Sequence, residues 1–131
     1  MIELHGWLTI RATYENEDKI EVEEEKTIAL VKELIQTLKW NNIQLKTRNG
    51  VYYIETSIFA NRKTQEIDEI NKFFKDVMSI AEGSYGMVYC WNDEDTNGKD
   101  NEFQVYIMAK GKIVTKDDVY LSPCIPTIEN E

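Results

Sequence analysis

Residues 43–59 read IQLKTRNGVYYIETSIF, and they carry the clearest local structural signal in the chain. Two stretches that favour extended structure, Ile43–Arg48 and Val51–Phe59, are separated only by Asn49-Gly50. Both turn residues accept the positive φ angles of a two-residue hairpin turn, so Asn-Gly between such stretches is a strong hairpin signal. The sequence therefore predicts two antiparallel strands joined by a tight turn.

Amphipathic helical patterns flank this hairpin on both sides. The apolar stripe before it comprises Ile28, Val31, Leu34, Ile35 and Leu38. The stripe after it begins near Thr64 and comprises Ile67, Ile70, Phe74, Val77, Met78 and Ala81. Gly83 is placed to end the second helix in the left-handed conformation. Because each helix has a single apolar stripe, we expect both to cover one face of a sheet.

Three further strands are predicted, at Glu3–Tyr14, Tyr85–Trp91 and Phe103–Lys110. In the first, apolar and polar side chains alternate as they do in a half-buried strand. The β-α-β-β-α-β-β order describes a single α+β domain, 1–131, with one mostly antiparallel sheet of about five strands and two helices on one face. Its first elements resemble a split βαβ arrangement. Residues 117–131 are expected to form an extended tail that packs on the sheet, since they combine apolar residues with two prolines.

Alternation within the strands divides their side chains between two faces. The face toward the helices is expected to hold Leu4, Leu8, Ile10, Val88, Cys90, Phe103, Val105 and Ile107. The opposite face would then hold Trp7, Tyr85, Met87, Tyr89, Trp91, Tyr106 and Met108. Tryptophan, tyrosine and methionine are enriched at protein interfaces, so this second face is a candidate binding surface. The apolar tail could instead cover it, or cover one half and leave the other to a partner.

The 131-residue chain has a net charge of −9. Such a charge repels nucleic acid and anionic membranes, and it attracts basic proteins; solubility alone is the alternative explanation. The N-terminus lacks a basic start and a long apolar run, so no signal peptide is expected, and no apolar stretch approaches the roughly 20 residues that span a bilayer. Cys90 and Cys124 fit no metal-binding pair. We therefore expect a cytoplasmic protein with reduced thiols.

No catalytic, metal or cofactor site is predicted. His5 is the only histidine, so it would have to serve any serine- or cysteine-based nucleophile. The Gly83–Gly86 segment follows a helix and precedes a strand, the reverse of the order in phosphate-binding loops. The Asp93–Gly98 run has the D-x-D-x-N-G pattern that opens an EF-hand loop, but its twelfth position is Gln104 instead of the bidentate glutamate. The protein is thus not expected to be an enzyme; a hydrolase that uses loop carboxylates is the least favoured alternative.

Four blocks of the sequence, in the same order, resemble the Imm7 family of bacterial immunity proteins. They are His5–Arg11 (HGWLTIR), Gly83–Gly86 (GSYG), Asn101–Val105 (NEFQV) and Leu121–Ile128 (LSPCIPTI). The resemblance covers nearly the whole chain and implies a cytoplasmic antidote in a polymorphic-toxin or contact-dependent competition system. Such a protein binds a cognate toxin domain and blocks it. The resemblance assigns no toxin-contacting residues.

The candidate partner-binding residues come from the physical pattern instead. Trp7, Tyr89 and Trp91 are expected to be the anchors of an interface, since buried aromatic clusters carry most binding energy. Beside them, the loop before the last predicted strand contributes Asp93, Glu94, Asp95, Asp100 and Glu102. Such an acidic loop would speed association with a basic toxin domain. The alternative is an acidic protein-binding or nucleic-acid-mimic module without a toxin partner.

Overall fold

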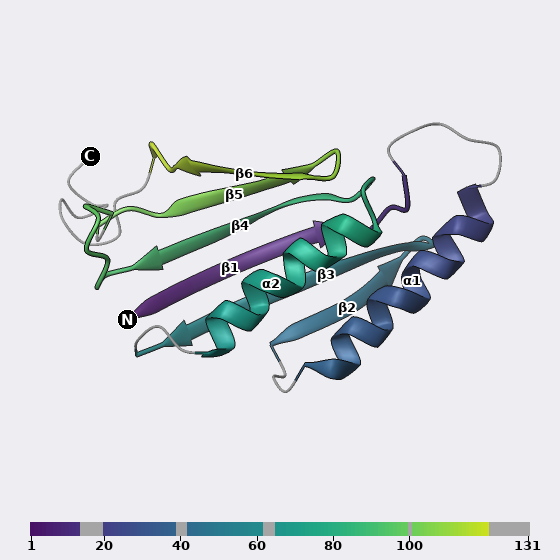
Figure 1. Ribbon diagram of the computed structural model, residues 1–131, viewed down its shortest axis with the longest axis horizontal. Helices are drawn as coiled ribbons and strands as arrows, with labels where there is room; N and C mark the ends of the chain where they lie inside the picture. The colour runs from purple at the N-terminus through teal and green to yellow at the C-terminus, as the bar shows by residue number, and fades with distance from the viewer. Residues whose placement is uncertain (14–19, 39–41, 62–64, 100, 121–131) are drawn as a thin grey trace.

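The computed structural model describes residues 1–13, 20–38, 42–61, 65–99 and 101–120. Within these ranges the elements are, in order, β1 (Ile2–Thr9), α1 (Ile20–Thr37), β2 (Ile43–Arg48), β3 (Val51–Ala60), α2 (Gln65–Ile80), β4 (Tyr85–Asn92), β5 (Gln104–Ala109) and β6 (Lys112–Asp117). The strands form one six-stranded antiparallel sheet in the order β2-β3-β1-β4-β5-β6 (Figure 1). The predicted α+β class is confirmed, with one strand more than expected.

The first six elements form two interleaved split β-α-β units. β3 lies between β1 and β2, and β1 lies between β3 and β4. Each helix therefore connects two parallel strands across an antiparallel one. Because crossovers of this kind are right-handed, both helices lie on the same face of the sheet. α2 lies over the middle of the sheet, and α1 lies over the side formed by β2 and β3 (Figure 1).

Positive φ angles mark two tight hairpins. Asn49 (φ 53°) and Gly50 (φ 78°) connect β2 to β3, as the sequence predicted. Lys110 (φ 51°) and Gly111 (φ 72°) connect β5 to β6 in the same way. β6 was not expected, because lysine at the first turn position lacks the Asn-Gly signature and five of the six strand residues are exposed. An edge strand of this kind shows no apolar alternation in its sequence.

α2 ends without the left-handed glycine that the sequence predicted. Gly83 is not among the residues with a positive φ angle. Instead, the backbone N–H of Ala81 donates to the carbonyl of Val77 (2.7 Å), and that of Ser84 donates to the carbonyl of Ala81 (3.0 Å). These bonds satisfy carbonyls at the end of the helix. The prediction for Gly83 was wrong.

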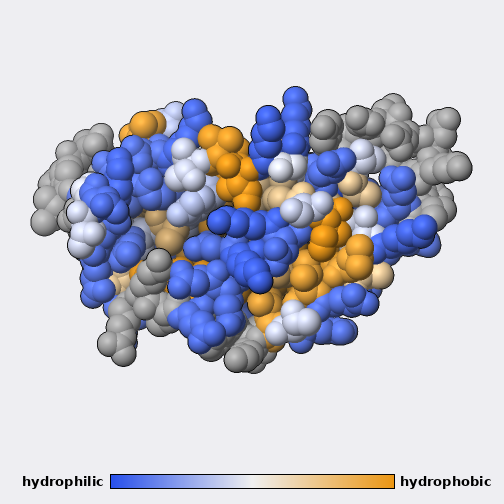
Figure 2. Space-filling model, in the orientation of Figure 1, coloured by the Kyte–Doolittle hydropathy of each residue, from blue (hydrophilic) through white to orange (hydrophobic). Residues whose placement is uncertain are grey.

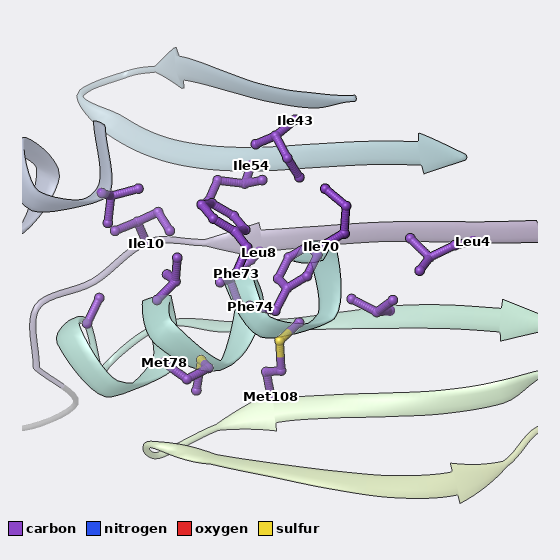
Figure 3. Close-up of a cluster of buried hydrophobic side chains, with 14 of the residues drawn as sticks. Leu4, Leu8, Ile10, Ile43, Ile54, Ile70, Phe73, Phe74, Met78 and Met108 are labelled. Carbon is purple, nitrogen blue, oxygen red and sulfur yellow. The ribbon is translucent and has the colours of Figure 1, made fainter. Parts of the chain in front are cut away.

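Both helical stripes pack on the same strand face and form one core. Figure 3 shows the part of this core where α2 meets the strands. Ile28 and Val31 of α1 are buried, and the predicted α2 stripe is buried along its whole length together with Phe73. The strands contribute Ile2, Leu4, Leu8, Ile43, Ile54, Ile58, Val88 and Met108 to this core, and Ile10 follows β1. The helix predictions are thus confirmed at the level of individual side chains.

The side chains of β5 alternate in the opposite phase to the prediction. Tyr106 pairs with Val88 and Met108 pairs with Gly86, so both point toward the helices, and Met108 is 1% exposed. Val105 and Ile107 were predicted to face the helices, but they lie on the other face of the sheet. Phe103, which was also predicted to face the helices, lies before the first residue of β5. The loop before β5 has no periodicity, so the sequence does not connect the alternation of β4 to that of β5. A shift of one residue then exchanges the two faces.

Two glycines allow β1 to lie close to its neighbours. A Cβ atom at Gly6 would lie 2.9 Å from Val88 Cγ2 and 3.3 Å from Thr56 Cγ2. A Cβ atom at Gly86 would lie 2.1 Å from the backbone oxygen of Trp7. Real side chains do not tolerate the second distance, so the pairing of β1 with β4 requires glycine at position 86.

The predicted tail begins inside β6, since Asp117 is the last residue of that strand. Val119 and Tyr120 follow it and are 82% and 87% exposed. Residues 121–131 lie outside the described part of the chain. Packing of the tail on the sheet therefore stays a prediction.

Candidate functional site

The face of the sheet opposite the helices, called the open face below, carries a continuous apolar row. In the pairing register this row crosses four strands, through Trp7, Met87, Ile107 and Val114. Tyr85 and Tyr89 lie on either side of Met87 along β4 and share its face. Trp7 is 42% exposed and Tyr85 is 46% exposed. Large apolar side chains therefore reach solvent at the centre of the sheet.

Contacts between neighbouring side chains hold this aromatic group in place. The rings of Trp7 and Tyr85 meet edge to face, with centroids 6.3 Å apart. The hydroxyl of Tyr89 lies 3.5 Å from the sulfur of Met87. Side chains that are already held lose less conformational freedom on binding, which favours tight association. Trp7 and Tyr89, two of the predicted anchors, thus lie on one preformed surface.

Trp91, the third predicted anchor, has a different position. Its side chain shares the open face but is only 6% exposed, and its ring centroid lies 6.2 Å from that of Phe103. The sequence did not indicate this burial, because alternation along β4 does not reveal that Phe103, beyond the following loop, packs against Trp91. Trp91 therefore supports the surface and offers little area for contact. Contact of Trp91 with a partner stays a prediction.

Carboxylates of the loop between β4 and β5 organise the loop itself. Asp95 Oδ2 accepts hydrogen bonds from the backbone N–H groups of Asn97 (2.9 Å) and Lys99 (3.0 Å). Asp93 contacts the amino group of Met1, and its backbone N–H donates to the Met1 carbonyl (3.1 Å). Two residues predicted to contact a partner thus also have a structural role.

Lys99 ties this loop to β6. Its Nζ donates to Asp117 Oδ2 (2.9 Å) and lies 3.6 Å from Glu102 Oε2. The bond to Asp117 raises the pKa of Lys99, and the same bond holds the pKa of the Asp117 carboxyl below its ordinary value. Glu102 is therefore already engaged in an ion pair, whereas Glu94 is exposed. Asp100, the remaining predicted contact, lies outside the described residues.

Three neighbours hold His5 on the open face. Its Nε2 lies 2.6 Å from Glu3 Oε2, and its Nδ1 lies 3.2 Å from Ser57 Oγ. The imidazole also meets the ring of Phe59 edge to face at 5.4 Å. Sequence reasoning missed this carboxylate–imidazole–hydroxyl set, because Ser57 joins it only through the pairing of β1 with β3. The contacts orient His5 and Phe59 at one end of the open face.

A hollow of about 770 Å³ opens where α1 passes the β2–β3 turn. Its wall includes Ile10, Ile28 and Tyr52, and Tyr85 also borders it. Lys32 Nζ lies 5.3 Å from the centroid of the Tyr52 ring, within reach of a cation–π contact. Figure 2 shows the helix side of the molecule, where hydrophilic residues cover most of the surface and apolar residues gather between α1 and α2. The sequence did not indicate this hollow, because its lining comes from several elements.

Metal ligands and membrane spans were sought among the described residues. No group of three His, Cys, Asp or Glu side chains is placed there to hold a metal ion. None of the helices in that part of the chain is long and apolar enough to cross a membrane.

The first two sequence blocks meet where β1 ends and β4 begins. Gly6 and Gly86 permit the close packing of β1 described above. Ser84 is completely buried; its Oγ accepts a hydrogen bond from the backbone N–H of Arg11 (3.0 Å) and lies within donating distance of the Arg11 carbonyl (3.4 Å). These residues therefore build the scaffold and do not form a contact surface.

Comparison with protein families agrees with the resemblance in the four blocks. The family model for immunity protein 7 (Imm7) matches residues 1–130, which is nearly the whole chain. No curated protein and no solved structure gives a match. The chain therefore belongs to the immunity protein 7 family.

Proposed function

We propose that this protein binds a cognate bacterial toxin domain in the cytoplasm and neutralises it by covering its active or substrate-binding surface. Membership of the immunity protein 7 family supports a toxin partner. The preformed pair of Trp7 and Tyr85 on the open face is the observation that supports this surface as the contact. Tryptophan and tyrosine are the residue types most enriched among the side chains that dominate binding energy.

Trp7 is the main anchor in this proposal. Its register partners Glu55 and Met87, together with Thr9 two residues along β1, leave Trp7 42% exposed above the sheet. Removing an anchor of this kind costs about 2 kcal/mol or more, which is roughly a thirtyfold loss of affinity. Tyr89 would add contact area beside it.

The net charge of −9 supports attraction of a basic toxin domain over long distances. Among the loop carboxylates, Glu94 is the freest to contribute, because Asp93 and Asp95 also hold the loop. Electrostatic attraction of this type mainly raises the association rate and weakens with salt. Affinity would come from the aromatic surface.

The test is co-expression with a cognate toxin domain, sought first in the open reading frame immediately upstream of the gene. The wild-type protein is expected to restore growth, and Trp7→Ala is expected to bind the purified, inactivated toxin about thirtyfold more weakly. Leu30→Ala is the matched control, since Leu30 is a 46% exposed apolar residue on α1. Cell death despite soluble wild-type protein would exclude the immunity function. Equal binding by the two variants would exclude the open face as the contact.

A further inference from the structure

The open face does not share the acidity of the whole chain. Its strand positions carry four basic residues against two acidic ones. The basic residues are Lys46, Arg48, Lys112 and Lys116, and the acidic residues are Glu3 and Glu55. We propose that the toxin surface seated on the open face has an apolar centre flanked by carboxylates, which pair with the cations of β6 and β2. This inference rests on the proposed function and specifies the chemistry of the partner.

Both acidic residues of this face already have partners on it. Glu55 Oε2 accepts a hydrogen bond from Lys46 Nζ (2.8 Å), and Glu3 Oε2 lies 2.6 Å from His5 Nε2. The remaining charge on the face is therefore positive. Asp118 lies beyond the end of β6, where its Oδ1 accepts a hydrogen bond from the backbone N–H of Tyr120 (2.8 Å).

The unpaired cations stand at the two edges of the sheet. Lys112 and Lys116 are exposed on β6 and flank Val114, which is 47% exposed. Arg48 is exposed on β2, at the opposite edge, beside Val51. In the part of the chain that the structure describes, none of these three cations has a hydrogen bond or ion pair. Lys99 differs, since Asp117 engages it.

Contact across this face would bring a partner close to Lys112 and Lys116. Binding is weakened when a lysine loses its water at the interface without gaining a carboxylate partner. A positive charge of the partner placed opposite the lysine would weaken binding further. Carboxylates on the toxin at these points would satisfy both lysines. Long-range attraction of a basic toxin domain is compatible with these local carboxylate contacts. The net charge of −9 acts before contact, whereas the edge cations act within about one Debye length, roughly 8–10 Å.

The first test compares two charge reversals that change the net charge equally. Lys112→Glu/Lys116→Glu alters the open face, and Lys26→Glu/Lys75→Glu alters exposed positions on α1 and α2. Binding to the inactivated cognate toxin domain is measured by stopped flow, after thermal melting has shown that both variants are folded. The open-face variant is expected to dissociate at least tenfold faster than wild type, and the helix variant at the wild-type rate. Equal dissociation rates for the two variants would overturn the inference.

The second test identifies the chemistry of the contact directly. A zero-length carbodiimide reagent joins amines only to neighbouring carboxylates. Crosslinks from Lys112 or Lys116 to Asp or Glu of the toxin are expected. Crosslinks that join only carboxylates of this chain to toxin lysines would overturn the inference and leave the immunity function intact. Failure of the wild-type protein to bind the toxin at all would instead refute the proposed function.

Discussion

Replacing Gly86 with alanine is expected to destabilise the fold by at least about 3 kcal/mol, the upper part of the range for overpacked sites. The added Cβ would lie 2.1 Å from the backbone oxygen of Trp7 and 2.7 Å from the Cα of Leu8. Both obstacles are backbone atoms of β1, so no side-chain rotation relieves the clash. The strands must separate at the centre of the sheet, next to the core residue Leu8, which is completely buried.

Gly6→Ala is the matched control for this substitution. There the new methyl group meets the methyl carbons of Val88 (2.9 Å) and Thr56 (3.3 Å), which belong to side chains. Side-chain shifts relieve such contacts only in part, because Val88 and Thr56 are buried and β-branched. The lower conformational entropy of the unfolded alanine chain offsets about 0.4–1 kcal/mol of the cost. We expect the free energy of unfolding of Gly6→Ala to fall by about 1–2 kcal/mol, which is less than for Gly86→Ala because only side chains must move.

Urea unfolding and thermal melting, both followed by far-ultraviolet circular dichroism, compare the two variants with wild type. For a domain of this length, about 3 kcal/mol corresponds to a fall in Tm of roughly 10 °C. A Gly86→Ala variant that melts within about 2 °C of wild type would refute the backbone argument. So would a Gly6→Ala variant that is less stable than Gly86→Ala.

Three more predictions test the roles of single side chains. Ser84→Ala leaves the backbone N–H of Arg11 without its acceptor and is expected to lower the unfolding free energy by about 1–3 kcal/mol in urea titrations; a neutral effect would show that this hydrogen bond is not needed. Trp91→Ala is expected to lower the free energy of unfolding by about 3–5 kcal/mol because the Trp91 side chain is buried. Trp7→Ala should instead weaken toxin binding far more than it lowers stability. If Trp7→Ala were the more destabilising change and Trp91→Ala the more damaging to binding, the two assigned roles would be exchanged. Burial, with a smaller contribution from Cys90, raises the pKa of Tyr106. As pH rises, Tyr106 ionises in the unfolded chain before it ionises in the folded protein. Its contribution to stability should therefore be intact below the ordinary tyrosine pKa of about 10 and be lost as pH rises through the raised pKa of the folded protein. The Tyr106→Phe variant should lose less stability than wild type between pH 9 and 11, and parallel urea midpoints for the two proteins across that range would contradict this role for Tyr106.

Local signals predicted those parts of the fold that depend on local interactions. The Asn49-Gly50 turn has the expected positive φ angles, the α2 stripe is buried, and the α1 stripe is buried or half-buried against the same core. β6 and the phase of β5 were missed because they depend on a Lys110-Gly111 turn and on an aperiodic loop. For the candidate site, this means that Ile107 lies on the open face, where Tyr106 was predicted. Tyr106 lies on the face toward the helices instead.

The candidate site was predicted in part, for the same physical reason. Alternation along β1 and β4 placed Trp7, Tyr85 and Tyr89 on one face, and the structure agrees. Burial of Trp91 against Phe103 depends on where the loop returns, and the set of Glu3, His5 and Ser57 depends on strand register. The open-face cations of β6 could not be found without β6 itself.

The residues that identify the family and the residues that could contact a toxin fall in different places. Gly86 and Ser84 belong to the blocks that resemble the family, and both are buried where β1 meets β4. A buried glycine or serine offers no area to a partner, so these positions specify the scaffold. Trp7 and Tyr85 are exceptions, since they lie within the first and second blocks and are 42% and 46% exposed. A toxin contact common to proteins with these blocks would therefore centre on Trp7 and Tyr85, and specificity for one toxin would come from residues at the edge of the sheet, such as Lys112 and Lys116.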